Sequence, residues 1–297
     1  MGYFINCQFN ATEERKTPVS VSLTTSPCDF AENLLEIVKN QPENGIKKKF
    51  GVCVKFTCFD KRDFMIKFVE WVHLLRVLGV DKIHMYNRYV HADTYKAMKY
   101  FESLDWLEVR EFLEPFEVPF KHPTDDGRAS KRAVEIMTIN DCIYRNRELY
   151  EYILVVDPDE IPIPRRPNET TLYDFLKVFE DKNIYDSYSF HCVTYPDLNF
   201  KAVSDVPEYH YMLQHIRRSK EFMRYHNFER MYLGKALYSM DNDEIISVNH
   251  HGTQLCHNRP CEILNVPEEA WQMSHYRDSI KEPSDSVTIE DLSLIHI

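Results

Sequence analysis

The residues of this sequence best suited to chemistry form a short acidic run, Asp157-Pro158-Asp159-Glu160. When such a run makes a tight turn after a strand, both aspartates can reach one cation or its bound waters. Hard divalent cations such as Mg²⁺ and Mn²⁺ prefer these oxygen ligands. The run therefore predicts a metal site that binds phosphate groups and stabilises a negatively charged leaving group. The alternative is a solvated acidic turn without a metal.

The position of the acidic run supports the metal-site prediction. Residues 152–156 directly before it are an unbroken apolar stretch, which is typical of a strand buried on both faces. Strands and helices alternate along the preceding chain, which predicts an α/β fold with a mostly parallel central sheet flanked by helices. Ligands of such sheets bind beyond the carboxyl ends of the strands, where we expect the run to lie. The expected elements are strands at 52–59, 82–86, 106–110 and 152–156, and helices at about 64–78, 93–103 and 128–149. One apolar stripe places the last helix: Ile136, Ile139, Ile143 and Tyr150.

The chain after Pro167 is more irregular and more aromatic than the first half. Its pattern predicts a helix near 171–180, a strand at 187–195, an aromatic segment rich in His and Arg at 207–230, and short strands near 231–238 and 245–249. We expect a single domain that includes both halves. The expected divisions are an N-terminal stem or flap at 1–50, the domain at 51–285 with a nucleotide-sugar half at 51–165 and an acceptor half at 166–285, and a frayed or non-native tail at 286–297.

Composition limits the classes of partner. The formal net charge is −11, from 36 basic and 47 acidic residues, which argues against nucleic acid as the main partner. Hydrophobic residues make up 43% of the chain, enough for a substantial core. The seven glycines form neither a G-x-G-x-x-G motif nor a Walker A loop. If a nucleotide binds, a metal ion is therefore the natural group to neutralise its phosphates.

Cysteine usage and sequons favour an oxidising compartment. The eight cysteines form no C-x-x-C pair, so disulfide bonds fit better than a structural zinc site. Two N-x-[ST] sequons begin at Asn10 and Asn168. The sequence contains no membrane-spanning stretch and no signal peptide. We therefore expect either a cytosolic protein or a chain whose N-terminal anchor lies outside this sequence.

Four segments of the chain form a recognisable series of motifs. They are Glu70-Trp71-Val72-His73 with Leu78-Gly79-Val80-Asp81-Lys82-Ile83 and Tyr86; Asn140-Asp141-Cys142-Ile143-Tyr144; Val155-Val156-Asp157-Pro158-Asp159-Glu160-Ile161-Pro162; and Ser274-His275-Tyr276-Arg277. Together they resemble the pattern of glycosyltransferase family 92, formerly catalogued as domain of unknown function 23. They cover about residues 51–280 in the order of the family, with Pro158 standing where the family often has an aliphatic residue. The resemblance implies a GT-A fold, a UDP-sugar donor (often UDP-galactose), Mn²⁺, inversion at the anomeric carbon and a glycan acceptor. It also implies a type II Golgi membrane protein, with an anchor that this sequence lacks.

The resemblance and the residue types together nominate site residues, each with a purely structural role as the alternative. A metal in this fold needs a third protein ligand, which we expect to be one of the two neighbouring histidines that follow the 245–249 strand. An inverting transfer needs a general base on the acceptor side. The candidates are Asp157, Asp159 and either His250 or His251 for the metal; Arg62, Asp157, Lys235, His275 and Arg277 for the donor; and Asp197 or Glu229 for the general base. Structural roles are expected for Glu70, Asp141 and Cys142.

Two other functions fit part of the pattern. Haloacid-dehalogenase-like phosphohydrolases also have an apolar strand that ends in D-x-D, with the first Asp as nucleophile. Their motif usually lies on the first strand, whereas three strands precede Asp157, and Glu160-Ile161-Pro162 stands where Thr or Val is usual. A GT-A-like domain that binds a glycan without turnover is the second alternative. The complete acidic motif argues against that alternative.

Overall fold

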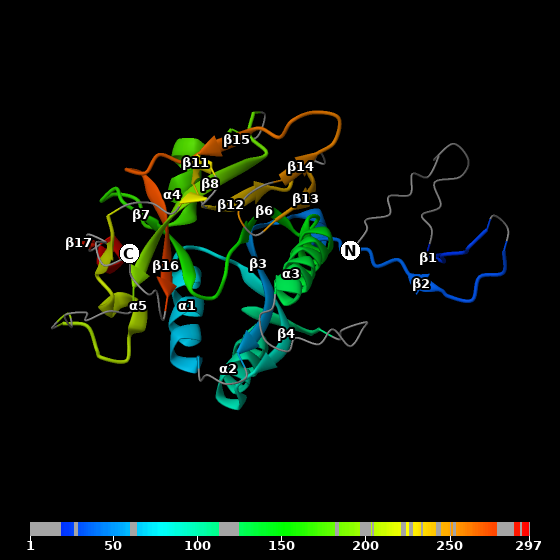
Figure 1. Ribbon diagram of the computed structural model, residues 1–297, viewed down its shortest axis with the longest axis horizontal. Helices are drawn as coiled ribbons and strands as arrows, with labels where there is room; N and C mark the ends of the chain where they lie inside the picture. The colour runs from blue at the N-terminus through cyan, green and yellow to red at the C-terminus, as the bar shows by residue number, and fades with distance from the viewer. Residues whose placement is uncertain are drawn as a thin grey trace.

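The computed structural model, drawn in Figure 1, describes most of the chain as one α/β body with a small N-terminal extension. The described residues are 19–26, 29–59, 64–112, 125–181, 184–196, 203, 205–220, 224–225, 228–232, 234–241, 245–249, 251, 254–277, 288–291 and 293–296. Of these, 56, 58–59, 125–133, 224–225, 228–232, 254, 277, 288–289 and 295–296 are described by their backbone alone.

A nine-stranded sheet forms the centre of the body. Its order is β5-β4-β3-β6-β12-β8-β16-β7, and β15 pairs with β8 off this path. The strands are β3 (Lys48–Phe59), β4 (Lys82–Val90), β5 (Leu107–Glu111), β6 (Tyr150–Val155), β7 (Glu160–Pro164), β8 (Ser187–Pro196), β12 (Gly234–Ser239), β15 (Ile263–Asn265) and β16 (Trp271–Arg277).

Strand direction gives this sheet one edge where carboxyl ends gather. The four strands from β5 to β6 pair in parallel, β12 is antiparallel to both of its neighbours, and β8 pairs in parallel with β16. Consequently β3, β4, β5, β6, β8 and β16 all point the same way. Only β7, antiparallel to β16, and β12 run against them along the main path of the sheet in the described part of the chain.

Helices cover both faces of the sheet. Alternate residues of β3 point to opposite faces: Val52 and Val54 belong to the larger core cluster, whereas Cys53 belongs to the smaller one. The larger cluster includes side chains of α1 (Met65–Val77), α2 (Ala92–Ser103) and α4 (Leu172–Phe179). The smaller cluster includes side chains of α3 (Asp125–Asn146). The predicted architecture, a mostly parallel central sheet flanked by helices, is therefore confirmed.

The remaining described elements are short. The N-terminal extension contains a two-stranded hairpin that stands apart from the body in Figure 1. No helix in the described part of the chain is long and apolar enough to cross a membrane. The short elements are β1 (Ser20–Val21), β2 (Leu35–Glu36), η1 (Glu43–Gly45), α5 (Tyr211–Gln214), β9 (Arg217–Ser219), β10 (Arg224–Tyr225), β11 (Phe228–Tyr232), β13 (Ile245–Val248), β14 (Gln254–Cys256), β17 (Thr288–Glu290) and η2 (Ser293–His296).

Two expectations from the sequence need correction. The tail at 286–297 is not frayed where it is described: β17 pairs with β9, and Asp291 is buried in an ion pair with Arg218 at 2.5 Å. The stripe expected on the long helix is also wrong in part. Ile136 is 38% exposed and Tyr150 already belongs to β6, because α3 ends at Asn146 and the chain needs a turn before the strand.

A disulfide joins the sheet to its α3 side. Cys53 of β3 and Cys142 of α3 are both buried, and they lie 89 residues apart in the sequence. A cross-link of this length removes much of the conformational freedom of the unfolded chain. The second described disulfide, Cys256–Cys261, spans only 5 residues and constrains the unfolded chain far less.

Replacement of the long-range disulfide tests this assignment. We expect Cys142→Ala to lower the free energy of unfolding by about 4 kcal/mol and Cys261→Ala by about 2 kcal/mol, because the entropy of loop closure grows with loop length. Urea unfolding of both variants, each against the oxidised wild type, measures the two losses. Equal losses, or no loss for Cys142→Ala, would contradict a structural role for the long-range disulfide.

Candidate active site

The acidic run forms a closed turn at the carboxyl edge of the sheet. It leaves β6 at Val155 and enters β7 at Glu160. Inside the turn, the Asp157 N–H donates to a Glu160 carboxylate oxygen at 2.9 Å, and the Glu160 N–H donates to the Asp157 carbonyl at 3.0 Å. The Trp71 indole N–H of α1 donates to the Glu160 carbonyl at 2.8 Å. The turn is thus held from within and from the helix beside it.

Asp157 lies between two lysines from different strands. Its Oδ2 atom is 3.0 Å from the Lys55 ammonium of β3 and 3.2 Å from the Lys235 ammonium of β12. Burial alone would raise the pKa of Asp157, but the two adjacent ammonium groups outweigh burial and hold this pKa well below its ordinary value. Asp157 is therefore a permanent anion whose charge is already balanced by protein groups.

Lys235 connects Asp157 to Glu160. Its side chain is only 2% exposed, and its ammonium lies 2.9 Å from Glu160 Oε2. Burial lowers the pKa of Lys235, but the charges of Asp157 and Glu160 more than compensate and raise it above its ordinary value. Lys55 extends the network in the other direction, since its ammonium is 3.3 Å from Glu135 Oε1 of α3. The two lysines thus balance the charges of Asp157 and Glu160, and Lys55 links this network to Glu135.

Asp159 is the accessible carboxylate of the run. Its side chain is 35% exposed, and its Oδ2 lies 3.4 Å from His275 Nε2 of β16. The Nδ1 atom of the same imidazole is 3.5 Å from Glu160 Oε1. Burial lowers the pKa of His275, whereas Glu160 and Asp159 raise it, and the net shift is upward. The Tyr276 N–H donates to the Asp159 carbonyl at 2.8 Å, which fixes the outer part of the turn to β16.

This geometry allows a test of how a divalent cation fits. Two adjacent ligands of an octahedral cation with bonds of about 2.1 Å lie roughly 3 Å apart, and the 3.4 Å between Asp159 and His275 is close to that spacing. Asp157 fits less well because two ammonium groups already occupy the neighbourhood of its carboxylate. The geometry therefore gives less support to a cation held by both aspartates, which stays a prediction. Asp159 and His275 form the better ligand pair.

The structure brings four of the predicted site residues together: Asp157, Asp159, Lys235 and His275. His251 lies in the turn after β13, where its N–H donates to Asn249 Oδ1 at 2.9 Å. The backbone of Arg277 pairs with Pro196 at the carboxyl edge of β8 and β16. The other candidates stay predictions. Arg62, Asp197 and His250 lie outside the described residues, and only the backbone of Glu229 and Arg277 is described.

The three residues expected to be structural all have partners. Glu70 is buried and accepts hydrogen bonds from three backbone N–H groups of residues 211–213. Asp141 pairs with Arg145 at 2.7 Å and accepts a hydrogen bond from Tyr86, although its side chain is 43% exposed rather than buried. Cys142 forms the disulfide with Cys53. Asp141 therefore has the structural partners expected of it, but at the surface of α3.

Sequence inspection missed Lys55 and Glu135, which complete the inner network. A signal for Lys55 was present, because it stands in a strand that was predicted to be buried. A charged side chain in such a strand requires a partner of opposite charge. No comparable signal marks Glu135, because α3 carries several charged residues and the sequence alone does not say which one faces the sheet.

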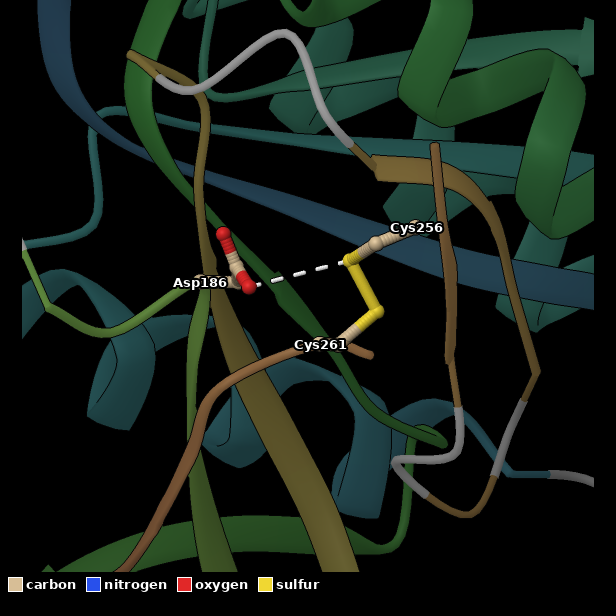
Figure 2. A group of neighbouring side chains, drawn as sticks. All are labelled: Asp186, Cys256 and Cys261. Carbon is tan, nitrogen blue, oxygen red and sulfur yellow. Dashed lines mark hydrogen bonds between the residues drawn. A yellow bond between two sulfur atoms is a disulfide. The ribbon is translucent and has the colours of Figure 1, made fainter. Parts of the chain in front are cut away.

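A second cluster of potential ligands serves a structural purpose. Figure 2 shows Asp186 beside Cys256 and Cys261, the one group of three potential metal-ligand residues found among the described residues. The two cysteines form a disulfide, so the 3.7 Å approach of Cys256 Sγ to Asp186 involves no thiol proton. Asp186 instead accepts hydrogen bonds from Arg259 at 2.7 and 2.8 Å and from the Glu262 N–H at 2.8 Å. The cluster fastens the 256–262 loop to the start of β8.

The mostly parallel sheet, with an acidic turn and a histidine at its carboxyl edge, is the arrangement in which α/β proteins bind ligands at that edge. The chain belongs to glycosyltransferase family 92, because the model of that family matches residues 48–293. The match includes β17 and reaches the start of η2, in agreement with their packing against the body.

Comparison with individual proteins gives more distant matches. A curated relative, "Beta-1,4-galactosyltransferase galt-1" of Caenorhabditis elegans, is 25% identical over 138 residues, which is 46% of this chain and 30% of the relative. The match thus spans less than a third of that relative's length. Among solved structures, S. aureus TarS 1–349 is similar with a TM-score of 0.37 and 13% identity, covering 73% of this chain and 60% of TarS 1–349. The same fragment in complex with UDP has a TM-score of 0.35 and 12% identity over the same shares of the two chains.

Removal of the Lys235 ammonium tests the inner network. We expect Lys235→Met to lower the free energy of unfolding by about 3 to 5 kcal/mol, because it leaves the buried Glu160 and Asp157 carboxylates short of a positive charge. Denaturant unfolding at neutral pH measures the loss. Lys99→Met is the matched control: Lys99 is 49% exposed and pairs with Glu102 on the surface, so its loss should stay below about 1 kcal/mol. A loss below about 1 kcal/mol for Lys235→Met would refute the network.

Proposed function

We propose that this chain is a metal-assisted glycosyltransferase that moves galactose from UDP-galactose onto a glycan acceptor with inversion at the anomeric carbon. The observation that carries the proposal is the acidic turn with His275 at the carboxyl edge, within a chain of glycosyltransferase family 92. The galactosyltransferase name of the C. elegans relative supports galactose as the sugar. TarS 1–349 was solved in complex with UDP, but its likeness to this chain is too distant to carry an argument about the donor.

We expect the donor diphosphate to bind at the accessible carboxylate of the turn. Asp159 and His275 are the pair that would hold Mn²⁺ or Mg²⁺, and His250 or His251 stays a predicted additional ligand. A cation held there would neutralise the diphosphate and stabilise UDP as the leaving group. Lys55 contributes a second positive charge at the same edge, since its side chain is 22% exposed while the Lys235 side chain is 2% exposed. Arg62 and Arg277 stay predicted donor contacts.

The reaction needs one proton acceptor on the acceptor side. In an inverting transfer, the acceptor hydroxyl oxygen forms a bond to the anomeric carbon while the bond from that carbon to the diphosphate oxygen breaks. The hydroxyl proton passes to a general base. Asp197 and Glu229 remain our candidates for that base.

Two disulfides among the described residues support a lumenal location. We therefore propose the Golgi lumen as the location of this protein. Asn168, which begins the second sequon, is exposed and would be accessible to glycosylation there. Family membership also argues against the phosphohydrolase alternative. The other alternative, a domain that binds glycans without turnover, would be excluded by activity in a transfer assay.

The exposed aspartate of the turn provides a direct test. We expect Asp159→Asn to lower kcat for transfer from UDP-galactose by at least about 100-fold, because the variant loses a charge that holds the diphosphate and its cation. Mn²⁺-dependent UDP release in the presence of a pool of N-glycans measures the rate. The melting temperature should change little, since Asp159 is partly exposed. Asp105→Asn, 71% exposed and remote from the turn, should keep full activity. Full activity in Asp159→Asn would end the metal-assisted proposal.

Paired histidine variants identify the metal ligand. We expect His275→Ala to raise the Mn²⁺ concentration for half-maximal activity at least about tenfold, because the imidazole faces Asp159 at ligand spacing. His251→Ala is the matched comparison, and titration of activity with Mn²⁺ after chelation measures both. If His251→Ala shifts the Mn²⁺ requirement and His275→Ala does not, the ligand assignment reverts to the turn after β13.

A further inference from the structure

An aromatic segment lies beside the outer part of the acidic turn. We call residues Tyr209–His215 the aromatic ledge. Its Tyr211 and His215 rings lie 4.1 Å apart, and each is 6.4 Å from the ring of Tyr276 on β16. Tyr276 follows His275 directly and donates its N–H to the Asp159 carbonyl. The ledge therefore packs on the residue that follows His275 in β16, whose ring points to the opposite face of the sheet from the imidazole.

Glu70 of α1 holds the ledge in place. Its carboxylate accepts hydrogen bonds from the N–H groups of Tyr211, Met212 and Leu213 at 2.7, 2.8 and 3.1 Å. It is also 3.4 Å from His210 Nδ1. Figure 1 shows the outcome, with α5 beside α1 and close to the carboxyl end of β16. A buried carboxylate that accepts three backbone hydrogen bonds fixes the segment far more firmly than an ordinary loop is fixed.

The ledge lies at one end of the site, opposite the lysine end. Along the carboxyl edge, Lys55 marks β3 and His275 marks β16, with β6, β12 and β8 between them. A donor diphosphate held by Asp159 and His275 would lie at this same end, which places the second substrate beyond β16, where the ledge lies.

Tyr209 gives the ledge an exposed ring. It is 64% exposed, and its ring lies 4.6 Å from the His210 ring at a 41° tilt. The other rings of the ledge are less available, because His215 is buried and Lys67 covers the Tyr211 ring at 3.6 Å. Sugar rings present apolar C–H faces that pack on aromatic rings, so the exposed ring of Tyr209 is suited to such a ligand. His210, with a side chain 31% exposed, adds a polar group beside that face.

We propose that the aromatic ledge binds the acceptor glycan and that Tyr209 is the residue on which an acceptor sugar ring stacks. This inference rests on the proposed function, because it assigns the acceptor side of the same site. Glu70 acts as a positioning residue, since it holds the ledge without facing the substrate. The ledge therefore determines acceptor affinity and leaves donor binding to the turn and the lysines.

Acceptor kinetics test the ledge. The probes are UDP-galactose, Mn²⁺ and a pool of N-glycans released from glycoproteins, with UDP release as the rate and mass spectrometry to identify the product. We expect Tyr209→Ala to raise the KM for the acceptor about five- to tenfold, of the order expected for loss of one aromatic stacking contact, with the KM for UDP-galactose unchanged. Tyr209→Phe and Tyr209→Trp keep a ring and should restore the wild-type KM.

A matched control and two contrary outcomes complete the test. Tyr100 on α2 is 60% exposed, so Tyr100→Ala removes an equally accessible ring far along the sheet and should change neither KM. An unchanged acceptor KM in Tyr209→Ala, with wild-type transfer intact, would overturn the ledge and leave the proposed function standing. Failure of the wild-type chain to transfer to any glycan of the pool would instead overturn the proposed function, and the ledge with it.

Discussion

The buried contact between Lys235 and two carboxylates is the interaction on which the site depends. An ammonium group or a carboxylate is costly to bury alone, and each is tolerated here because the other lies within hydrogen-bonding distance. This contact also accounts for strand direction. Lys235 and Glu160 stand at the beginnings of β12 and β7, the two strands that run against their neighbours. Only a strand that starts at the carboxyl edge can deliver its first residues there.

The network separates a fixed inner part from an accessible outer part. Lys55, Lys235, Asp157 and Glu160 balance one another's charge, and hydrogen bonds of Glu160 close the turn. Asp159 and His275 stand at the rim with a partly exposed carboxylate. Groups held in this way need little reorganisation when charge arrives, which is what electrostatic stabilisation of a leaving group requires. Within the turn, Asp157 and Glu160 thus belong to the fixed inner part, and Asp159 is the accessible residue.

The sequence predicted the fold better than it predicted the partners within the site. The apolar run before Asp157 and the alternation of strands and helices were enough to place the acidic turn at a carboxyl edge, because those signals are local. The pairing of Asp159 with His275 depends on β16, which lies more than a hundred residues later and reaches the turn through sheet order. Sheet order is set by packing rather than by local pattern. For the same reason, the local sequence pattern does not predict that β17 pairs with β9.

The separation of the two lysines in the sequence has a consequence for how the protein is made. Lys55 emerges early during synthesis, whereas Lys235 follows 180 residues later, after Asp157 and Glu160 have already appeared. Until β12 inserts between β6 and β8, Glu160 lacks its lysine partner and Asp157 has only Lys55. The charge balance of the turn is therefore reached only after β12 has been made and has joined the sheet. A product that ends before β12 would reveal itself by a hydrated, open edge.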